Sequence, residues 1–467
     1  MPTSDARRVL LKDEVLDQLA EVANVAQFVS FAPGEPPVQR FCRLHGHPPN
    51  QRFATPEHAV EALLRASDRA SVNVRSFHAA GSKGGPFIYG LSDRDEALDV
   101  VRRYARSGLH TIVNETIDVK DGGVSGVALG GVVEFAPGST PRAVEEAGTV
   151  VLERDAASRL LETVYGFVPE LDFKPDERVE FSIHPLVAGV RRKHTIVWER
   201  EQVTRVELSA ALVWPNRFSR FIGDKAFGLL VADTLDLAVP ATIVVARNIA
   251  PFRFGRRTGT AETWLRTCPK EPAPGKFPTH HGWRDPFALL AEEDPDGDTL
   301  ASVLAQESVA ARWSGAALPD ADGGLVVEGV PGFGDEFMLG RQAPATPPDE
   351  VVRDVSALTA RAAAEMGPVR LEWAHDGEQA WVLQFHLAAG VARSGMIYPG
   401  EPSRWHSFDP VEGLDSLRHL IARASAAGAG ILVTGDVGIT SHVGDLLRKA
   451  AIPSRLAHSV GGRRADR

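Results

Sequence analysis

The sequence predicts a multidomain protein of the α/β and α+β classes, built on mixed sheets. Its 467 residues correspond to two to four domains at about 100–200 residues each. Segments with strand-like and helix-like patterns alternate along the whole chain. The 43 glycines and 32 prolines indicate many turns between these segments.

The expected elements follow from local patterns. Residues 94–108 should form a helix, because apolar side chains recur there at helical spacing and Gly108 ends the run. Alternating or β-branched runs predict strands at 72–77, 109–119 and 323–330. Proline- and glycine-dense stretches predict linkers or loops at 135–141, 268–278 and 343–349.

Composition excludes several classes of protein. With 61 acidic and 51 basic residues, the net charge is −10, which argues against a general nucleic-acid or membrane-surface binder. Two cysteines, Cys42 and Cys268, supply neither a disulfide framework nor a metal cluster and suit a reducing compartment. The N-terminus lacks an apolar signal core. We therefore expect a cytoplasmic protein with no nucleic-acid or membrane partner, and its oligomeric state stays open.

The first 210 residues contain a pattern typical of a nucleotide-binding lobe. A strand carrying Arg75 leads into a glycine-rich loop at 79–87 that carries Lys83, and a strand with Glu115 follows. Glycines let backbone N–H groups approach phosphates, and a cation supplies charge. We expect Arg75, Lys83 and Glu115 to bind nucleotide, although a solvated loop lysine is an equal alternative for Lys83.

This order resembles the N-terminal lobe of ATP-grasp enzymes. The resemblance implies that 1–210 is an ATP-grasp-like region in which 121–135 and 178–201 form the sheet of the opposing lobe. Glu180 and Glu199 on that sheet have the hard oxygen ligands that Mg²⁺ takes. Ordinary surface carboxylates are the simpler interpretation of both.

The second half carries several short motifs in order. Gly223 and Lys225 open a helix, where a glycine turn followed by a lysine can hold a nucleotide phosphate. The other motifs are 300–317, the glycine-rich 326–341 with Gly334 and Arg341, and the hairpin-like 369–386 with Glu372 and Gln384.

These motifs resemble the phosphoenolpyruvate synthase, pyruvate phosphate dikinase and rifampicin phosphotransferase group. The resemblance implies a nucleotide-binding region at 211–395, in which Gly223, Lys225, Gly334 and Arg341 contact ATP. It also implies that Glu372 and Gln384 hold Mg²⁺. The group's arginine two residues after the glutamine is His386 here.

Strand alternation tests the metal interpretation. A two-residue turn at Asp376-Gly377 would put Glu372 and Gln384 on opposite faces of the hairpin. A three-residue loop at 375–377 would put both on one face. The metal site therefore requires the odd-length loop.

The most specific motif lies at 428–456. A buried strand leads to a glycine loop that includes Gly438, then to Thr440, Ser441 and His442 at the start of an amphipathic helix. Thr440 or Ser441 could cap that helix, and a phosphoryl group on His442 would meet its N–H groups. The alternative is a structural histidine at a capped helix start.

This motif resembles the swivelling phosphohistidine domain, or mobile domain, of the same PEP-utilising group. The resemblance implies that His442 carries a phosphoryl group, with Gly438, Thr440 and Ser441 supporting it, in a truncated domain at 400–467 that lacks the usual closing strands. Element order departs from the group, because V-R-S at 74–76 precedes G-D-K at 223–225. Either the nucleotide domain is permuted, or 1–210 is a separate domain.

The expected function is an ATP-dependent, dikinase-like phosphotransferase. It would use ATP and Mg²⁺, and pass a phosphoryl group through His442 to a small-molecule acceptor. One alternative is an ATP-grasp ligase that forms an acyl phosphate and an amide, for which His442 is dispensable. The other is a non-catalytic nucleotide-binding regulatory protein.

Overall fold

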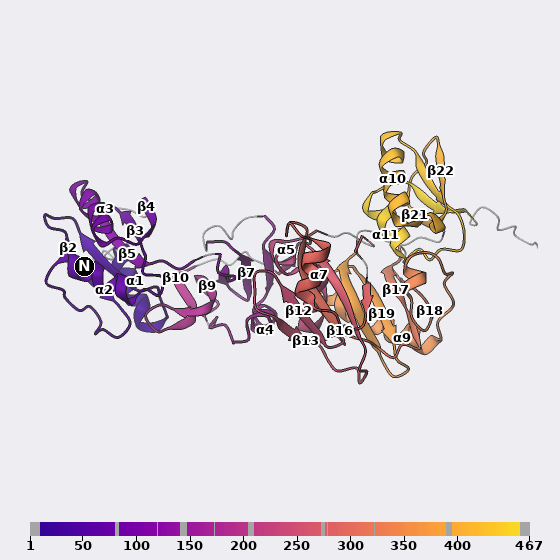
Figure 1. Ribbon diagram of the computed structural model, residues 1–467, viewed down its shortest axis with the longest axis horizontal. Coiled ribbons are helices and arrows are strands. Elements are labelled where there is room, and N and C mark those ends of the chain that lie inside the picture. The colour runs from indigo at the N-terminus through magenta and orange to yellow at the C-terminus, as the bar shows by residue number, and fades with distance from the viewer. Residues whose placement is uncertain are drawn as a thin grey trace, which may run out of the picture. The chain divides into compact units, whose positions relative to one another are not determined.

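The computed structural model (Figure 1) divides into two compact units, Met1–Ser158 with Val168–Ala210, and Arg159–Phe167 with Ala211–Arg467. Both contain sheets covered by helices, so the predicted multidomain α/β and α+β class is confirmed. The structure describes residues 10–79, 84–118, 120–140, 147–171, 173–203, 210–271, 276–277, 279–321, 323–388 and 395–457. Lys83 lies outside these residues.

The N-terminal unit begins with a five-stranded sheet of order β2-β1-β5-β3-β4. Neighbouring side chains on a strand point to opposite faces, and the core divides accordingly. Val113 packs with α2 and α3, whereas the adjacent Ile112 packs with α1. The elements are α1 Lys12–Val22, β1 Phe28–Ala32, β2 Val38–Arg43, α2 Pro56–Ala66, β3 Val72–Phe77, β4 Gly84–Leu91, α3 Arg94–Arg106 and β5 His110–Glu115.

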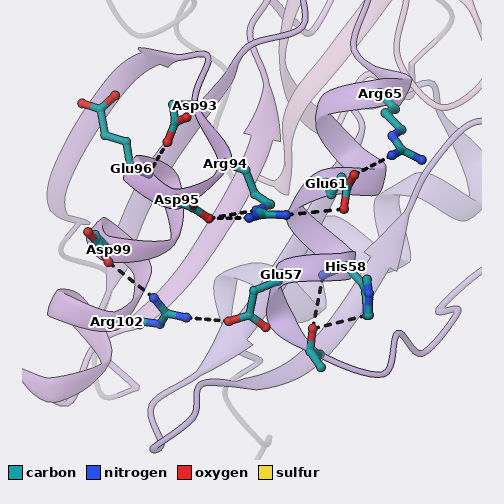
Figure 2. A network of polar contacts seen from close by, with 11 residues as sticks. Glu57, His58, Glu61, Arg65, Asp93, Arg94, Asp95, Glu96, Asp99 and Arg102 are labelled. Atoms are coloured by element: carbon teal, nitrogen blue, oxygen red, sulfur yellow. Dashed lines mark hydrogen bonds and ion pairs between the residues drawn. The ribbon is translucent and has the colours of Figure 1, made fainter.

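The predicted helix at 94–108 and the strand at 72–77 are confirmed as α3 and β3. The strand predicted at 109–119 is shorter, because β5 ends at Glu115. Ion pairs join α2 to α3 on the solvent side (Figure 2). Arg102 reaches Glu57 on α2 at 2.5 Å. Exposed pairs of this kind contribute about 0–1 kcal/mol each, so the apolar layer beneath them holds the helices.

A second antiparallel sheet in this unit has strand order β10-β9-β6-β7-β8. It joins the two segments 121–135 and 178–201, as expected for one lobe. The linker predicted at 135–141 is wrong for 135–137, because those residues complete β7 and pair with β6. The elements are β6 Val124–Leu129, β7 Val132–Pro137, β8 Val150–Glu153, α4 Arg154–Tyr165, β9 Glu177–Ala188 and β10 Lys193–Gln202.

The C-terminal unit opens with a five-stranded antiparallel sheet of order β13-β12-β16-β14-β15. Helices α5 and α6 meet at Gly223, which joins them with a positive φ of 94°. The elements are β11 Ala211–Leu212, α5 Arg217–Ile222, α6 Asp224–Thr234, β12 Thr242–Ala246, β13 Phe252–Phe254, β14 Thr263–Pro269, β15 Thr279–His281, α7 Pro286–Glu293 and β16 Leu300–Glu307.

A four-stranded antiparallel sheet of order β18-β17-β19-β20 follows. Helix α9 packs on it through buried Val351, Val355 and Leu358. The strand predicted at 323–330 is confirmed as β18. The elements are β17 Trp313–Pro319, β18 Leu325–Pro331, α8 Asp335–Met338, α9 Asp349–Met366, β19 Val369–His375 and β20 Ala380–Leu387.

The C-terminal module, residues 395–457, has a sheet of order β21-β24-β23-β22. Strand β24 pairs in parallel with β23, and β21 pairs with β24; the predicted truncation of this domain stays a prediction. Its core includes Leu318 of β17, so the module shares apolar contacts with the preceding sheet. The elements are β21 Met396–Tyr398, β22 Trp405–Phe408, a 3₁₀ turn Pro410–Glu412, α10 Gly413–Ala426, β23 Gly430–Val433, α11 His442–Lys449 and β24 Ser454–Leu456.

Among the described residues, no helix combines the length and the apolar character needed to cross a membrane.

Close packing of α6 on β20 gives the first testable prediction. A Cβ added at Gly228 would lie 2.2 Å from the Phe385 carbonyl oxygen. Gly228→Ala should therefore lower the free energy of unfolding by about 1–3 kcal/mol, the usual cost of overpacking. Chemical denaturation of the full chain measures this. Gly324→Ala is the control, because its nearest neighbour would be 3.8 Å away; equal stability of the two variants would contradict the prediction.

Candidate functional site

One cavity of the C-terminal unit opens between two of its sheets, β13-β12-β16-β14-β15 and β18-β17-β19-β20. Its enclosed volume is about 80 Å³, and the space around it opens to solvent, so it is small beside the roughly 300–1,000 Å³ of most small-molecule sites. The walls combine aromatic and apolar side chains with a few charges. They include Trp264, Arg266, Gln306, Ser308, Phe333, Gly334, Asp335, Met338, Glu372, Trp373 and Leu383.

The β19–β20 hairpin forms one wall, and its register differs from both sequence expectations. His375 pairs with Ala380, which leaves a four-residue loop at 376–379 in place of the predicted two or three residues. Continued without change, that register would put Glu372 and Gln384 on opposite faces. An irregularity at Leu383 shifts the register, and Glu372 pairs directly with Gln384. A bulge therefore supplies the shared face that the odd-length loop was expected to supply.

The same register places four polar side chains on one face of the hairpin. Arg370 pairs with His386, next to the Glu372–Gln384 pair. Arg370 Nη1 donates to Glu372 Oε1 at 3.1 Å, and Gln384 Nε2 lies 2.7 Å from His386 Nε2. We call these four residues the hairpin quartet. His386 replaces the arginine that the resemblance leads one to expect at this position. Arg370 supplies a guanidinium directly across from it, on the neighbouring strand.

Two further cations border this site. Lys225 stands in the first turn of α6, and burial lowers its pKa. Arg266 projects from β14, donates to Gln306 Oε1 at 2.8 Å, and also has a pKa lowered by burial. Glu372 counteracts both shifts. A Cβ at Gly223 would lie 2.4 Å from Cys268 Cβ, so only glycine lets α6 begin here.

The start of α11 brings His442 to the quartet. Its Nδ1 lies 3.8 Å from Glu372 Oε1, and the His442 side chain is 17% exposed. Nδ1 itself is buried and has no hydrogen-bond partner among the residues that the structure describes. Burial lowers the pKa of His442, against the pull of Glu372. For Glu372, burial raises the pKa, but His442 and Arg370 outweigh it and the net shift is downward. Burial thus favours the neutral form of His442, and the net shift favours the carboxylate form of Glu372.

The loop before His442 is held by two strands of the preceding sheet, β18 and β19. Glu328 Oε2 on β18 accepts from Thr440 N at 2.9 Å and from Thr440 Oγ1 at 2.8 Å. Arg370 Nη2 donates to the Thr440 carbonyl at 2.9 Å. A Cβ at Gly438 would lie 2.8 Å from Glu328 Oε2. Side-chain capping by Thr440 or Ser441 is wrong: Ser441 occupies the N-cap position without a capping bond, and Thr440 turns to Glu328.

Of the remaining predicted residues, the structure brings only some to the pocket. Gly334 lines the pocket, whereas Arg341 is half-exposed and lies 3.7 Å from Glu336. Arg75 is on β3 of the N-terminal unit. Glu115 of that unit accepts from Gln27 N at 2.7 Å, Gln27 Nε2 at 2.9 Å and Gly189 N at 3.0 Å. The carboxylate of Glu115, which was expected to bind a nucleotide, therefore accepts hydrogen bonds from donors within the protein.

The donor set of the hairpin fits a magnesium ion. Among the described residues, no group of three or more His, Cys, Asp or Glu side chains could hold a metal. Mg²⁺ in phosphate-transfer sites needs only one or two protein oxygen ligands, with phosphates and water completing the shell. Glu372 and Gln384 supply that number. Glu180 and Glu199 form a cross-strand pair on β9 and β10, and Glu180 is bound by Arg178 at 2.8 Å.

Sequence reasoning missed Arg266, Glu328 and Arg370. Arg370 carried a usable signal, because it precedes Glu372 by two residues on a predicted strand and so shares its face. Glu328 carried a weaker one, since it belongs to the glycine-rich motif 326–341. Arg266 had none, because its place beside the pocket depends on the pairing of β14 with β16.

No protein-family model matches the chain, and no curated protein matches it significantly. Solved structures with partial likeness include a D-cycloserine synthetase (19% identity, 42% of this chain, 62% of that chain, TM-score 0.24). A second is a RimK domain ATP-grasp protein from Sphaerobacter thermophilus (17% identity, 36% of this chain, 58% of that chain, TM-score 0.23). A third is a D-alanine–D-alanine ligase from Bacillus anthracis (8% identity, 36% of this chain, 59% of that chain, TM-score 0.24). The match spans about three fifths of each.

These neighbours are ATP-grasp fold proteins. They give no support to the PEP-utilising group. At TM-scores of 0.23 and 0.24, the likeness assigns no activity to this chain. The proposal below therefore rests on the geometry of the site.

Docking of the His442 loop can be tested at Glu328. Glu328→Ala removes the acceptor for both Thr440 donors, and hydrogen bonds to a charged group contribute about 1.5–3 kcal/mol each. Amide hydrogen exchange of residues 434–445 should then rise at least tenfold. Glu350→Ala, at an exposed glutamate of α9, is the matched control. Unchanged exchange in Glu328→Ala would show that this carboxylate does not hold the loop.

Proposed function

We propose that this chain is an ATP-dependent phosphotransferase in which His442 accepts a phosphoryl group from a nucleotide bound beside the hairpin quartet. One observation carries the proposal: His442 Nδ1 lies 3.8 Å from Glu372, and Glu372 also lines the pocket between the two sheets. Glu372 therefore links the histidine proposed as acceptor to the pocket proposed to bind the nucleotide.

The cations suit a polyphosphate. Lys225, Arg266 and Arg370 surround Glu372, and the aromatic part of the pocket, Trp264 and Phe333, suits a base. Phosphoryl transfer needs little covalent chemistry from the protein beyond positioning and charge neutralisation. Glu372 and Gln384 would hold Mg²⁺, which when bound neutralises charge on the phosphate oxygens.

His442 is prepared to act as a nucleophile. Burial keeps its imidazole neutral, so one ring nitrogen has a free lone pair. With Nδ1 facing Glu372, that nitrogen is Nε2. Its lone pair would form the N–P bond as the P–O bond to the leaving phosphate breaks, and the electron pair of that bond leaves with the nucleotide. Glu372 would orient the ring and stabilise the proton on Nδ1 as positive charge develops.

The ATP-grasp ligase is the second candidate. The names of the matched structures, a synthetase and a ligase, correspond to it. In this mechanism the same pocket would bind ATP, a carboxylate substrate would become an acyl phosphate, and an amine would displace the phosphate. Lys225, Arg266 and Glu372 would keep their roles, whereas His442 would have none.

Labelling separates the candidates. Incubation with Mg²⁺ and either γ- or β-labelled ATP should give an acid-labile, alkali-stable label on the protein, and the labelled position identifies the phosphate that moves. In His442→Ala, the amount of label on the protein should fall at least a thousandfold. His419→Ala is the matched control, because His419 is exposed on α10 of the same module; it should label like the parent protein.

Other outcomes would overturn the proposal. Amine-dependent ADP release that survives His442→Ala would establish the ligase. ATP binding without label or turnover would establish the nucleotide-binding regulatory protein.

A further inference from the structure

A buried line of polar contacts runs from α6 to the hairpin quartet. Trp214 Nε1 donates to Asp224 Oδ1 at 2.5 Å, and Asp224 Oδ2 lies 3.5 Å from His386 Nδ1. His386 Nε2 lies 2.7 Å from Gln384 Nε2. Asp224 is 3% exposed and His386 9%. The Trp214 ring meets His386 edge-on at 5.3 Å.

The donor and acceptor of each contact in this line can be assigned from the chemistry of the groups. Asp224 lies 3.5 Å from His386 Nδ1, and because a carboxylate can only accept hydrogen bonds, it favours the tautomer of neutral His386 with the proton on Nδ1. Nε2 then has a lone pair and can only accept. Its partner on Gln384 must be the amide NH₂, which leaves the amide carbonyl Oε1 available to a different ligand. Trp214 donates to the other Asp224 oxygen and holds that carboxylate in place.

We propose that Asp224 and His386 are positioning residues that fix the side-chain amide of Gln384 with its oxygen presented to the metal. The inference deepens the proposed function and rests on it for the metal. The tautomer of His386 can be tested without any ligand. His386 stands where the phosphotransferase group that this segment resembles has an arginine. In this chain, His386 would determine which end of the Gln384 amide faces the metal.

The substitution Asp224→Asn should reverse the orientation of the Gln384 amide. In Asp224→Asn the new amide can donate to Nδ1, which allows the proton to move to Nε2. Nε2–H then favours the Gln384 oxygen as its acceptor, and the amide turns its NH₂ toward the metal position. An NH₂ group cannot ligate Mg²⁺, so metal affinity should fall, while the fold loses no buried volume.

The first measurement uses the ligand-free full chain. Two-bond ¹⁵N–¹H correlation spectra of histidine-labelled protein report the tautomer of each ring, and loss of a signal in His386→Gln assigns His386. We expect the Nδ1–H tautomer in the parent chain and a shift toward Nε2–H in Asp224→Asn. An Nε2–H tautomer in the parent chain would overturn the inference and would leave the proposed function untouched.

The second measurement is Mn²⁺ binding, as a probe for Mg²⁺, to the full chain with a non-hydrolysable ATP analogue, followed by electron paramagnetic resonance. Asp224→Asn should weaken Mn²⁺ binding by 10- to 100-fold, the usual effect of losing an outer partner of a metal ligand. Asp354→Asn is the matched control, because Asp354 contacts His375 at 3.1 Å on the same hairpin outside the quartet. Equal affinity in the two variants would refute the inference, and no Mn²⁺ binding by the parent chain would refute the proposed function.

Discussion

The site depends on one register shift in a β-hairpin. Between the His375–Ala380 pair and the Glu372–Gln384 pair, Leu383 is left without a partner, and the polar side chains of β20 change face. Without that bulge, Gln384 and His386 would point away from Glu372 and Arg370. With it, two cross-strand pairs form the hairpin quartet. The pocket, the cations and the His442 loop all gather around that face.

Charge balance explains why so many ionisable groups can share a partly desolvated site. Removing an ion from water is costly unless opposite charges and hydrogen bonds compensate. Glu372 is bound by Arg370, and Asp445 of α11 lies 3.0 Å from Lys449 and 4.0 Å from Arg370. His442 meets the same constraint by staying neutral. Only the neutral form of an imidazole has a ring-nitrogen lone pair with which to act as a nucleophile.

The sequence predicted several elements but not the contacts that make the site. Periodicity and glycine stops located α3, β3, β18 and the strand before His442, because each depends on local residues. The quartet was half-predicted: Glu372 and Gln384 were named, but the bulge at Leu383 depends on how β19 and β20 pair over their whole length. The role of Glu328 arises from tertiary packing of the C-terminal module, which no local pattern encodes. Glu115 shows the opposite case, where a plausible ligand residue has internal partners.

A crystal structure of the full chain with Mg²⁺ and a non-hydrolysable ATP analogue would test the proposed site most directly. We expect polyphosphate between Lys225, Arg266 and Glu372, Mg²⁺ bound by Glu372 and Gln384 oxygens, and His442 as the side chain nearest a phosphorus atom. A nucleotide bound away from the hairpin quartet would contradict it. So would a nucleotide in the pocket with another side chain at the phosphorus and His442 turned away.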